Sequence, residues 1–162
     1  MLSATVRLAF FTVSLISMGA LATAYSLQRW AYLVPCPLCN VQRGMLAAAA
    51  LLGLVATLHA PGRRGTRAYA AGVVGLSLLG AGSALRQLWL QARVDPARAL
   101  DFLNAENAFK PMGLQENLKV YLLGTPSCSI VNWSFLGLSL PEWSLLSFCL
   151  LAALAGYLIS RR

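Results

Sequence analysis

Four long apolar stretches dominate the pattern of hydrophobic and polar positions along this chain. They run over residues 8–27, 41–59, 68–90 and 143–160. Each approaches or exceeds the roughly 20 residues that an α-helix needs to cross a bilayer of about 30 Å. None contains an aspartate or glutamate, and the alternating segments of a membrane β-barrel are absent. The pattern predicts an all-α membrane protein: a four-transmembrane-helix bundle forming one membrane domain over residues 1–162.

The composition agrees with lipid as the main solvent of this chain. Of its 162 residues, 58% are hydrophobic and only 11% are charged, whereas soluble domains carry about a quarter charged residues. The mean hydropathy is +0.66. A net charge of +8 could indicate nucleic-acid binding, so the positions of the charged residues have to be considered.

Six basic residues near the span ends fall on one side of the membrane if the spans alternate, whereas those on the other side lie mostly in a long loop together with acidic residues. The six are Arg7, the arginines of residues 63–67, and the arginines of residues 161–162. The positive-inside rule assigns this side, with both termini, to the cytoplasm. All five acidic residues lie in the long loop 91–142, which together with loop 28–40 then faces outward. The basic excess therefore reflects topology, and we expect no nucleic-acid partner.

Two segments each allow two interpretations. The first span, with Arg7 before it and Ala-Thr-Ala at residues 22–24, also resembles a cleavable signal peptide; we expect an uncleaved span. Within residues 112–123 of the long extracytoplasmic loop, apolar residues recur at helical spacing. A short helix there could lie on the membrane surface or pack on the protein.

Cys36 and Cys39 stand where the first outer loop enters the second span. Pro37 favours an extended Cys36 and suits the first helical position, so Cys36 becomes the N-cap and Cys39 lies in the first turn. Unpaired amides and the helix dipole favour a thiolate at such a place. Arg43 follows one turn later on the same face. Its cation would stabilise the thiolate further and could hold an anionic or carbonyl-bearing ligand.

A metal site and a purely structural disulfide are the alternatives for this pair. Zinc usually takes four ligands, and only Cys128 and His59 remain, with His59 predicted on the opposite side. We therefore predict no metal. A disulfide that encloses two residues closes a very small loop and stabilises little. Both considerations favour a redox role.

The other two cysteines receive different interpretations. Cys128 has no outer partner except the first pair, so it is a candidate for a transient or intermolecular disulfide; the alternative is an inert, shielded thiol. Cys149 falls within the fourth span, where we expect a small buried apolar filler.

Three segments resemble the DsbB-type disulfide bond formation proteins of bacterial inner membranes. Residues 34–43 read VPCPLCNVQR, which is similar to the family's Cys-x-x-Cys followed four residues later by arginine. Residues 86–91 resemble the end of its third span. Residues 128–143 resemble its second outer loop as it enters the fourth span.

The resemblance implies a quinone-linked thiol oxidase. Cys36 and Cys39 would pass electrons to ubiquinone or menaquinone, with Cys39 forming the adduct with the quinone. Arg43 would position the quinone, and Gln87 would lie near it. Cys128 would belong to a second pair that exchanges disulfides with a DsbA-like periplasmic thiol oxidoreductase. The expected location is the bacterial inner membrane, with the active cysteines periplasmic.

One departure from the family pattern bears on activity. The family has a further cysteine at about residues 96–100, where this chain has none; Ala99 could stand in its place. A partner dithiol could be oxidised directly at Cys36–Cys39, or Cys128 could attack that pair or hold the partner in a mixed disulfide. Two further alternatives are a divergent or trapped member with little turnover and a non-redox membrane scaffold.

Overall fold

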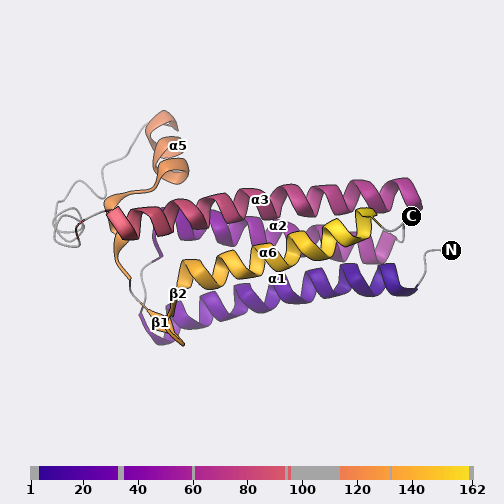
Figure 1. Ribbon diagram of the computed structural model, residues 1–162, viewed down its shortest axis with the longest axis horizontal. Helices are drawn as coiled ribbons and strands as arrows, with labels where there is room; N and C mark the ends of the chain where they lie inside the picture. Colours follow the sequence, from indigo (N-terminus) through magenta and orange to yellow (C-terminus); the bar gives the residue numbers. More distant parts are fainter. Residues whose placement is uncertain are drawn as a thin grey trace.

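Four long helices form the body of the molecule in the computed structural model, which describes residues 4–32, 35–59, 61–93, 95, 114–131 and 133–160. They are α1 (Ala4–Trp30), α2 (Pro37–His59), α3 (Arg63–Arg93) and α6 (Leu140–Ser160). All four are long and apolar enough to cross a membrane, and they lie side by side with both termini at one end (Figure 1). The predicted all-α, four-helix membrane fold is confirmed.

Every helix is longer than the apolar stretch that predicted it. Polar residues extend the ends: α3, for example, begins at Arg63 and ends at Arg93. Such residues continue the helix into the interfacial layers, where water and head groups solvate their side chains. The length of an apolar stretch therefore corresponds to the part of the helix inside the hydrocarbon core, and the helix extends beyond that part.

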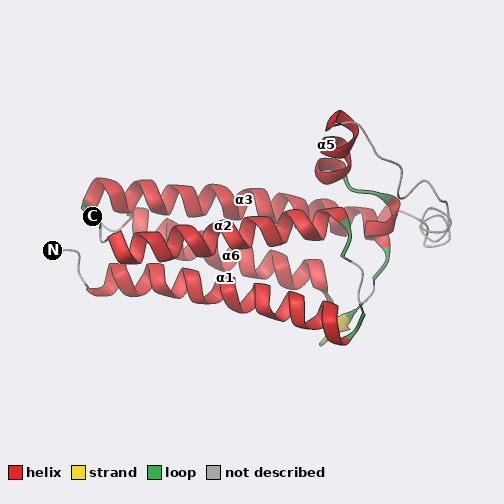
Figure 2. Cartoon of the chain, turned by 180° about the vertical axis from the view of Figure 1, so that it is seen from behind, coloured by secondary structure: helices red, strands yellow, loops and turns green. Residues whose placement is uncertain are grey.

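The end opposite the termini carries the smaller elements (Figure 2). They are helix α5 (Leu114–Leu123), the 3-10 turn η2 (Pro126–Ser129), and an antiparallel hairpin of β1 (Ser134–Phe135) and β2 (Leu138–Ser139). Leu136 and Gly137 join the strands with φ of 54° and 80°. Positive φ at both positions is the mark of a two-residue type I′ turn. The hairpin was not predicted, because each strand is only two residues long.

Helix α5 confirms the helical spacing seen within residues 112–123. The carbonyl of its last residue, Leu123, accepts a hydrogen bond from Arg86 Nε of α3 at 3.2 Å. Its apolar side chains Leu118, Tyr121 and Leu122 are exposed. That face is free to meet a membrane surface, and its location there stays a prediction.

The core lies between all four helices and depends on small residues. Phe10, Leu46, Val73 and Phe148 are among its buried members, one from each helix. The ring of Phe148 lies directly over Gly80 of α3, where an added Cβ would overlap it. In a membrane, where lipid tails are as apolar as the core, such close packing is what holds helices together.

Helices α1 and α6 touch one another much less than their other neighbours. α6 packs chiefly against α3, and α1 chiefly against α2. At the end that carries the hairpin, a cavity lies beside this looser boundary.

The expectation that Cys149 is buried is wrong. Its side chain is exposed, while Phe148, Leu151 and Ala155 are buried. Residue 149 lies about 100° around the helix from Phe148 and so falls off the buried stripe. In a bilayer this thiol would face lipid.

We expect Gly80→Ala to destabilise the bundle by about 1–3 kcal/mol, because the new methyl group overpacks against Phe148. Thermal unfolding in detergent measures the loss. Gly82→Ala is the matched control, since nothing lies within 4 Å of a Cβ at Gly82. Equal effects at the two glycines would contradict this packing.

Candidate active site

Cys36 and Cys39 lie at the beginning of α2 in the arrangement predicted from sequence. The helix begins at Pro37, and the Cys36 carbonyl accepts the N–H of Asn40 at 3.2 Å. The Cys36 sulfur accepts the N–H of Cys39 at 3.4 Å. Cys36 is therefore the N-cap, with a sulfur where serine or aspartate commonly stands.

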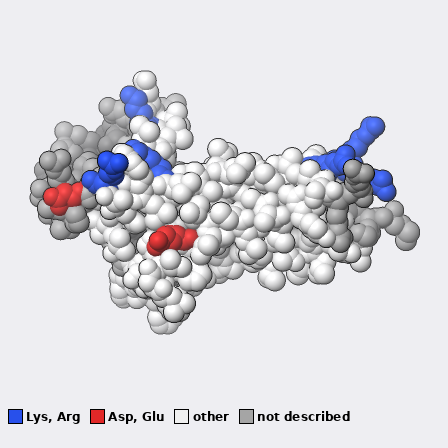
Figure 3. Space-filling model, in the orientation of Figure 1, with Lys and Arg blue, Asp and Glu red and all other residues white. Residues whose placement is uncertain are grey.

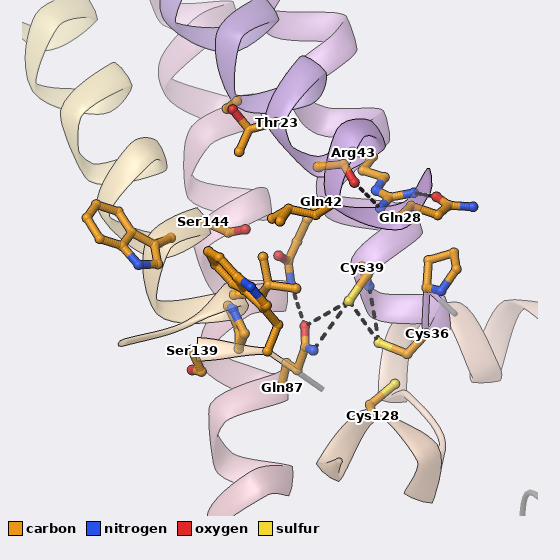
Figure 4. Close-up of a pocket in the computed structure, with 18 of the residues that line it drawn as sticks. Thr23, Gln28, Cys36, Cys39, Gln42, Arg43, Gln87, Cys128, Ser139 and Ser144 are labelled. Atoms are coloured by element: carbon orange, nitrogen blue, oxygen red, sulfur yellow. Dashed lines mark hydrogen bonds between the residues drawn. The ribbon is translucent and has the colours of Figure 1, made fainter. Parts of the chain in front are cut away.

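Three free sulfurs come together at this point (Figure 4). Cys36 Sγ lies 3.1 Å from Cys39 Sγ, and Cys36 also packs against Cys128 of η2. Cys128 is only 1% exposed and packs with Leu38 and Leu90. Cys36 thus has a sulfur on either side, one from its own helix and one from the later loop.

The thiols of Cys36 and Cys128 have pKa values shifted in opposite directions. Cys36 donates to Cys128, and this bond lowers the pKa of Cys128 from 9.0 to about 6. Hydrogen bonds from the backbone at Leu38 and Thr125 act in the same direction, against burial. The same bond to Cys128, the bond to Cys39 and burial raise the pKa of Cys36. These shifts favour a thiol at Cys36 and a thiolate at Cys128, and the thiolate is the nucleophilic form.

Gln87 of α3 contacts Cys39 from the opposite side. Its Nε2 lies 3.4 Å and its Oε1 3.6 Å from Cys39 Sγ, and Oε1 also accepts a 2.9 Å hydrogen bond from Gln42 Nε2. Both glutamines are 4% exposed. Sequence reasoning named Gln87 but missed Gln42. The available signal was a polar residue one turn after Cys39 inside an apolar span.

Arg43 extends from α2 toward α1 rather than toward the sulfurs. Its Nη1 donates to Gln28 Oε1 at 2.5 Å and its Nη2 to the carbonyl of Ala24 at 3.1 Å. The guanidinium carbon lies 4.8 Å from the centre of the Tyr25 ring. Neither Gln28 nor Tyr25 was singled out from sequence. They hold a cation in a fixed position one turn from Cys39.

All five residues predicted for the site border one cavity of about 350 Å³. Its wall combines the end of α1, the start of α2, the end of α3, η2, the hairpin and the start of α6. The predicted residues in the wall are Cys36, Cys39, Arg43, Gln87 and Cys128. Their roles stay predictions, but the fold brings all five residues to the same cavity.

Aromatic side chains from the hairpin and α6 form one side of the cavity. The rings of Trp133 and Phe135 are stacked at 5.8 Å, and Phe135 lies 6.3 Å from Trp143. Trp143 Nε1 donates to the Phe135 carbonyl at 3.3 Å. Glu142 accepts from both the N–H and the hydroxyl of Ser139, which fastens the hairpin to the first turn of α6. This is a variant of the capping box.

Within the ranges described above, no group of three His, Cys, Asp or Glu side chains is arranged to hold a metal ion. The segment around residues 96–100, where the DsbB pattern has its further cysteine, lies outside the described residues.

A four-helix membrane bundle with clustered thiols beside an apolar cavity is the arrangement expected of a membrane thiol–disulfide oxidoreductase. The family model "Disulfide bond formation protein DsbB" matches residues 6–158. The chain is similar to disulfide bond formation protein B of Aromatoleum aromaticum, with 42% identity over 96% of this chain and 93% of that protein. It is 41% identical to disulfide bond formation protein B 2 of Pseudomonas entomophila, over 93% of this chain and 89% of that one.

No solved structure gives a significant match to the chain. The match to the family model and the similarity to these relatives show that the chain belongs to the DsbB family. It is a multi-pass membrane protein of disulfide bond formation, and this function implies a thiol oxidoreductase as its partner.

We expect the reduced protein to hold Cys128 as a thiolate down to about pH 6. The ultraviolet absorbance of thiolates, followed against pH in a Cys39→Ala, Cys149→Ala variant, measures this. Because the Cys36 thiol stabilises the thiolate, adding Cys36→Ala should move the midpoint up toward 9.0. A midpoint that does not change when Cys36 is removed would contradict the hydrogen bond.

Proposed function

We propose that this protein makes disulfides by passing electrons from a DsbA-like periplasmic thiol oxidoreductase through Cys36 and Cys39 to a membrane quinone, either ubiquinone or menaquinone. The observation that carries the proposal is the position of Cys39. Its sulfur borders an apolar cavity and contacts the amide of Gln87, with the Arg43 cation in the same wall.

The residues around the cavity fit a quinone head group. A quinone ring is flat and apolar and bears two carbonyl acceptors. Aromatic and aliphatic side chains supply most of the wall, and Arg43 and Gln87 supply N–H donors. The volume lies within the range typical of small-molecule sites. When bound, the quinone would take up two electrons and two protons and become a quinol.

The boundary between α1 and α6 is the natural path for a long apolar tail. Ala20 and Ala24 of α1 and Ser144 and Ser147 of α6 line the cavity there, and these two helices contact one another less than α1 contacts α2 or α6 contacts α3. Small side chains along a loose boundary leave room for an isoprenoid chain. We infer that a quinone enters and leaves sideways from the lipid.

The thiol steps balance as follows. A thiolate of the partner attacks Cys36 of the Cys36–Cys39 disulfide, forming a mixed disulfide and releasing Cys39 as a thiolate. Gln87 Nε2 can donate a hydrogen bond to that thiolate. The partner's second thiolate then attacks the partner sulfur that is bonded to Cys36. This forms the partner's disulfide and releases Cys36. The partner loses two electrons and two protons, and the cysteine pair gains them.

Cys128 offers a second route that needs no further cysteine. Its sulfur packs against Cys36, and from this position its thiolate could attack Cys36 of the oxidised pair, form a Cys36–Cys128 disulfide and release Cys39. The partner would then reduce Cys36–Cys128 instead. In both routes Cys36 exchanges disulfides and Cys39 delivers the electrons to the quinone.

We also propose that the termini are cytoplasmic and the cysteines periplasmic, in the bacterial inner membrane. In support, Arg63, Arg64 and Arg67 begin α3 at the end where the termini lie. On the face that Figure 3 shows, basic side chains stand at both ends, and the acidic side chains lie toward the opposite end. The cysteines lie at the opposite end. A cysteine-accessibility assay in intact cells tests the assignment.

Anaerobic reduction of added ubiquinone by the purified protein, with a reduced DsbA-like partner as electron donor, tests the proposed activity. We expect turnover with the natural sequence and none with Cys36→Ala or Cys39→Ala, since each removes a reacting sulfur. Turnover that persists in Cys128→Ala would establish the direct route, and turnover lost there would establish the Cys36–Cys128 route. Absence of turnover in the natural sequence would instead favour a trapped member or a scaffold.

Arg43→Met should weaken quinone binding by about 10- to 100-fold, because a hydrogen bond to a charged group contributes about 1.5–3 kcal/mol. Fluorescence quenching of the nearby tryptophans on quinone addition measures the affinity. Arg93→Met is the control, since Arg93 lies over Trp89 and does not border the cavity. If both variants bind quinone like the natural sequence, Arg43 has no part in the site.

A further inference from the structure

The proposed electron route accounts for the contact of Gln87 with Cys39, but it gives no role to the hydrogen bond between Gln42 and Gln87. Gln42 belongs to α2 and Gln87 to α3, and both are almost fully buried. Burying an amide in apolar surroundings is costly unless hydrogen bonds replace those to water. Two glutamines at adjoining positions of a membrane bundle therefore call for a physical explanation.

The direction of the hydrogen bonds supplies one. An amide side chain has an acceptor end and a donor end. Gln42 Nε2 donates to Gln87 Oε1 at 2.9 Å, so the acceptor end of Gln87 is occupied. Both ends of the amide also lie near Cys39 Sγ, with the donor Nε2 at 3.4 Å and the acceptor Oε1 slightly farther away at 3.6 Å. In this orientation Gln87 offers an N–H to a thiolate.

The reversed amide would have the opposite effect. If the Gln87 amide turned by 180°, its NH2 group would face the NH2 group of Gln42, and its oxygen would become the nearer of its two polar atoms to the sulfur. An oxygen can accept from a Cys39 thiol but repels a thiolate. Gln42 makes this reversal unfavourable, because two donors would then oppose each other in a buried place.

We propose that Gln42 is a positioning residue: through its hydrogen bond it holds the Gln87 amide with the N–H toward Cys39, and so favours the thiolate of Cys39. Gln42 does not touch the sulfur and acts only through Gln87 (Figure 4). The proposal deepens the proposed function and rests on it for its purpose, since Cys39 is there the leaving group and the electron donor. A more stable thiolate leaves a disulfide faster.

The competing explanation is structural, because a hydrogen bond between α2 and α3 could simply hold two helices together. The two explanations differ in one respect. A positioning residue loses its effect on Cys39 when Gln87 is absent, whereas a loosened helix pair disturbs Cys39 whether Gln87 is present or not. A double-mutant cycle separates them.

The test uses the full-length protein with Cys36→Ala, Cys128→Ala and Cys149→Ala, so that Cys39 is the single cysteine. The rate of its reaction with methyl methanethiosulfonate, followed against pH, reports the thiolate. Gln42→Met should slow the reaction at neutral pH by about three- to tenfold, as expected for partial loss of a hydrogen bond to a charged group. Gln87→Met should slow it at least as much, and the double variant no more than Gln87→Met alone.

Gln42→His should restore most of the rate, because an imidazole N–H can reach Gln87 Oε1 in place of the amide. Gln42→Asn, one methylene too short to reach, should be as slow as Gln42→Met, and it carries the test if the methionine variant does not fold. The proposal is overturned if Gln42→Met slows Cys39 equally with and without Gln87, or if the histidine variant is as slow as the methionine variant.

This readout needs neither quinone nor partner protein. A failure of quinone reduction would therefore count against the proposed function and leave the positioning result intact. Conversely, independent effects of Gln42 and Gln87 would overturn the positioning role while the electron route stood.

Discussion

The need to satisfy every backbone amide away from water governs this molecule. In lipid it permits only helices for the described spans, and it leaves unpaired N–H groups at each helix start. At the start of α2 one of these groups, the N–H of Cys39, is satisfied by the sulfur of Cys36. The rule that makes the chain a helical bundle thus also gives the cysteine pair its geometry. A reactive pair at a helix end needs no separate scaffold, because the cap and the chemistry use the same two residues.

The loops bring the remaining parts of the site to this helix end. The turn η2 buries Cys128 against Leu38 and Leu90, where its sulfur meets Cys36. The hairpin carries Phe135 to the cavity, and the Ser139–Glu142 hydrogen bonds fasten it to α6. These elements are short and have little core of their own. Their positions depend on packing against the bundle, so the cavity wall and the bundle form together.

Gln42, Gln87 and Arg43 are among the polar side chains that border the cavity, and each of the three is held by hydrogen bonds to a neighbouring helix. Gln42 is bonded to Gln87, and Arg43 is bonded to Gln28 and Ala24. An unpaired polar group would be costly at this depth, so each such residue requires a partner on a neighbouring helix. The partners also fix orientation. This arrangement directs the Gln87 amide toward Cys39 and the Arg43 guanidinium toward α1.

The sequence by itself determined the features that depend on local spacing. Apolar length predicted four spanning helices, Pro37 predicted the helix start, and the interval from Cys39 to Arg43 placed both on one face of α2. Only the tertiary structure decided which distant side chains meet. Gln42 pairs with a residue 45 positions away, Cys128 meets Cys36 from another loop, and Arg43 is held by α1. Rotation of α6 about its axis turned Cys149 outward. Periodicity describes one helix at a time, whereas these contacts depend on how helices and loops pack against each other.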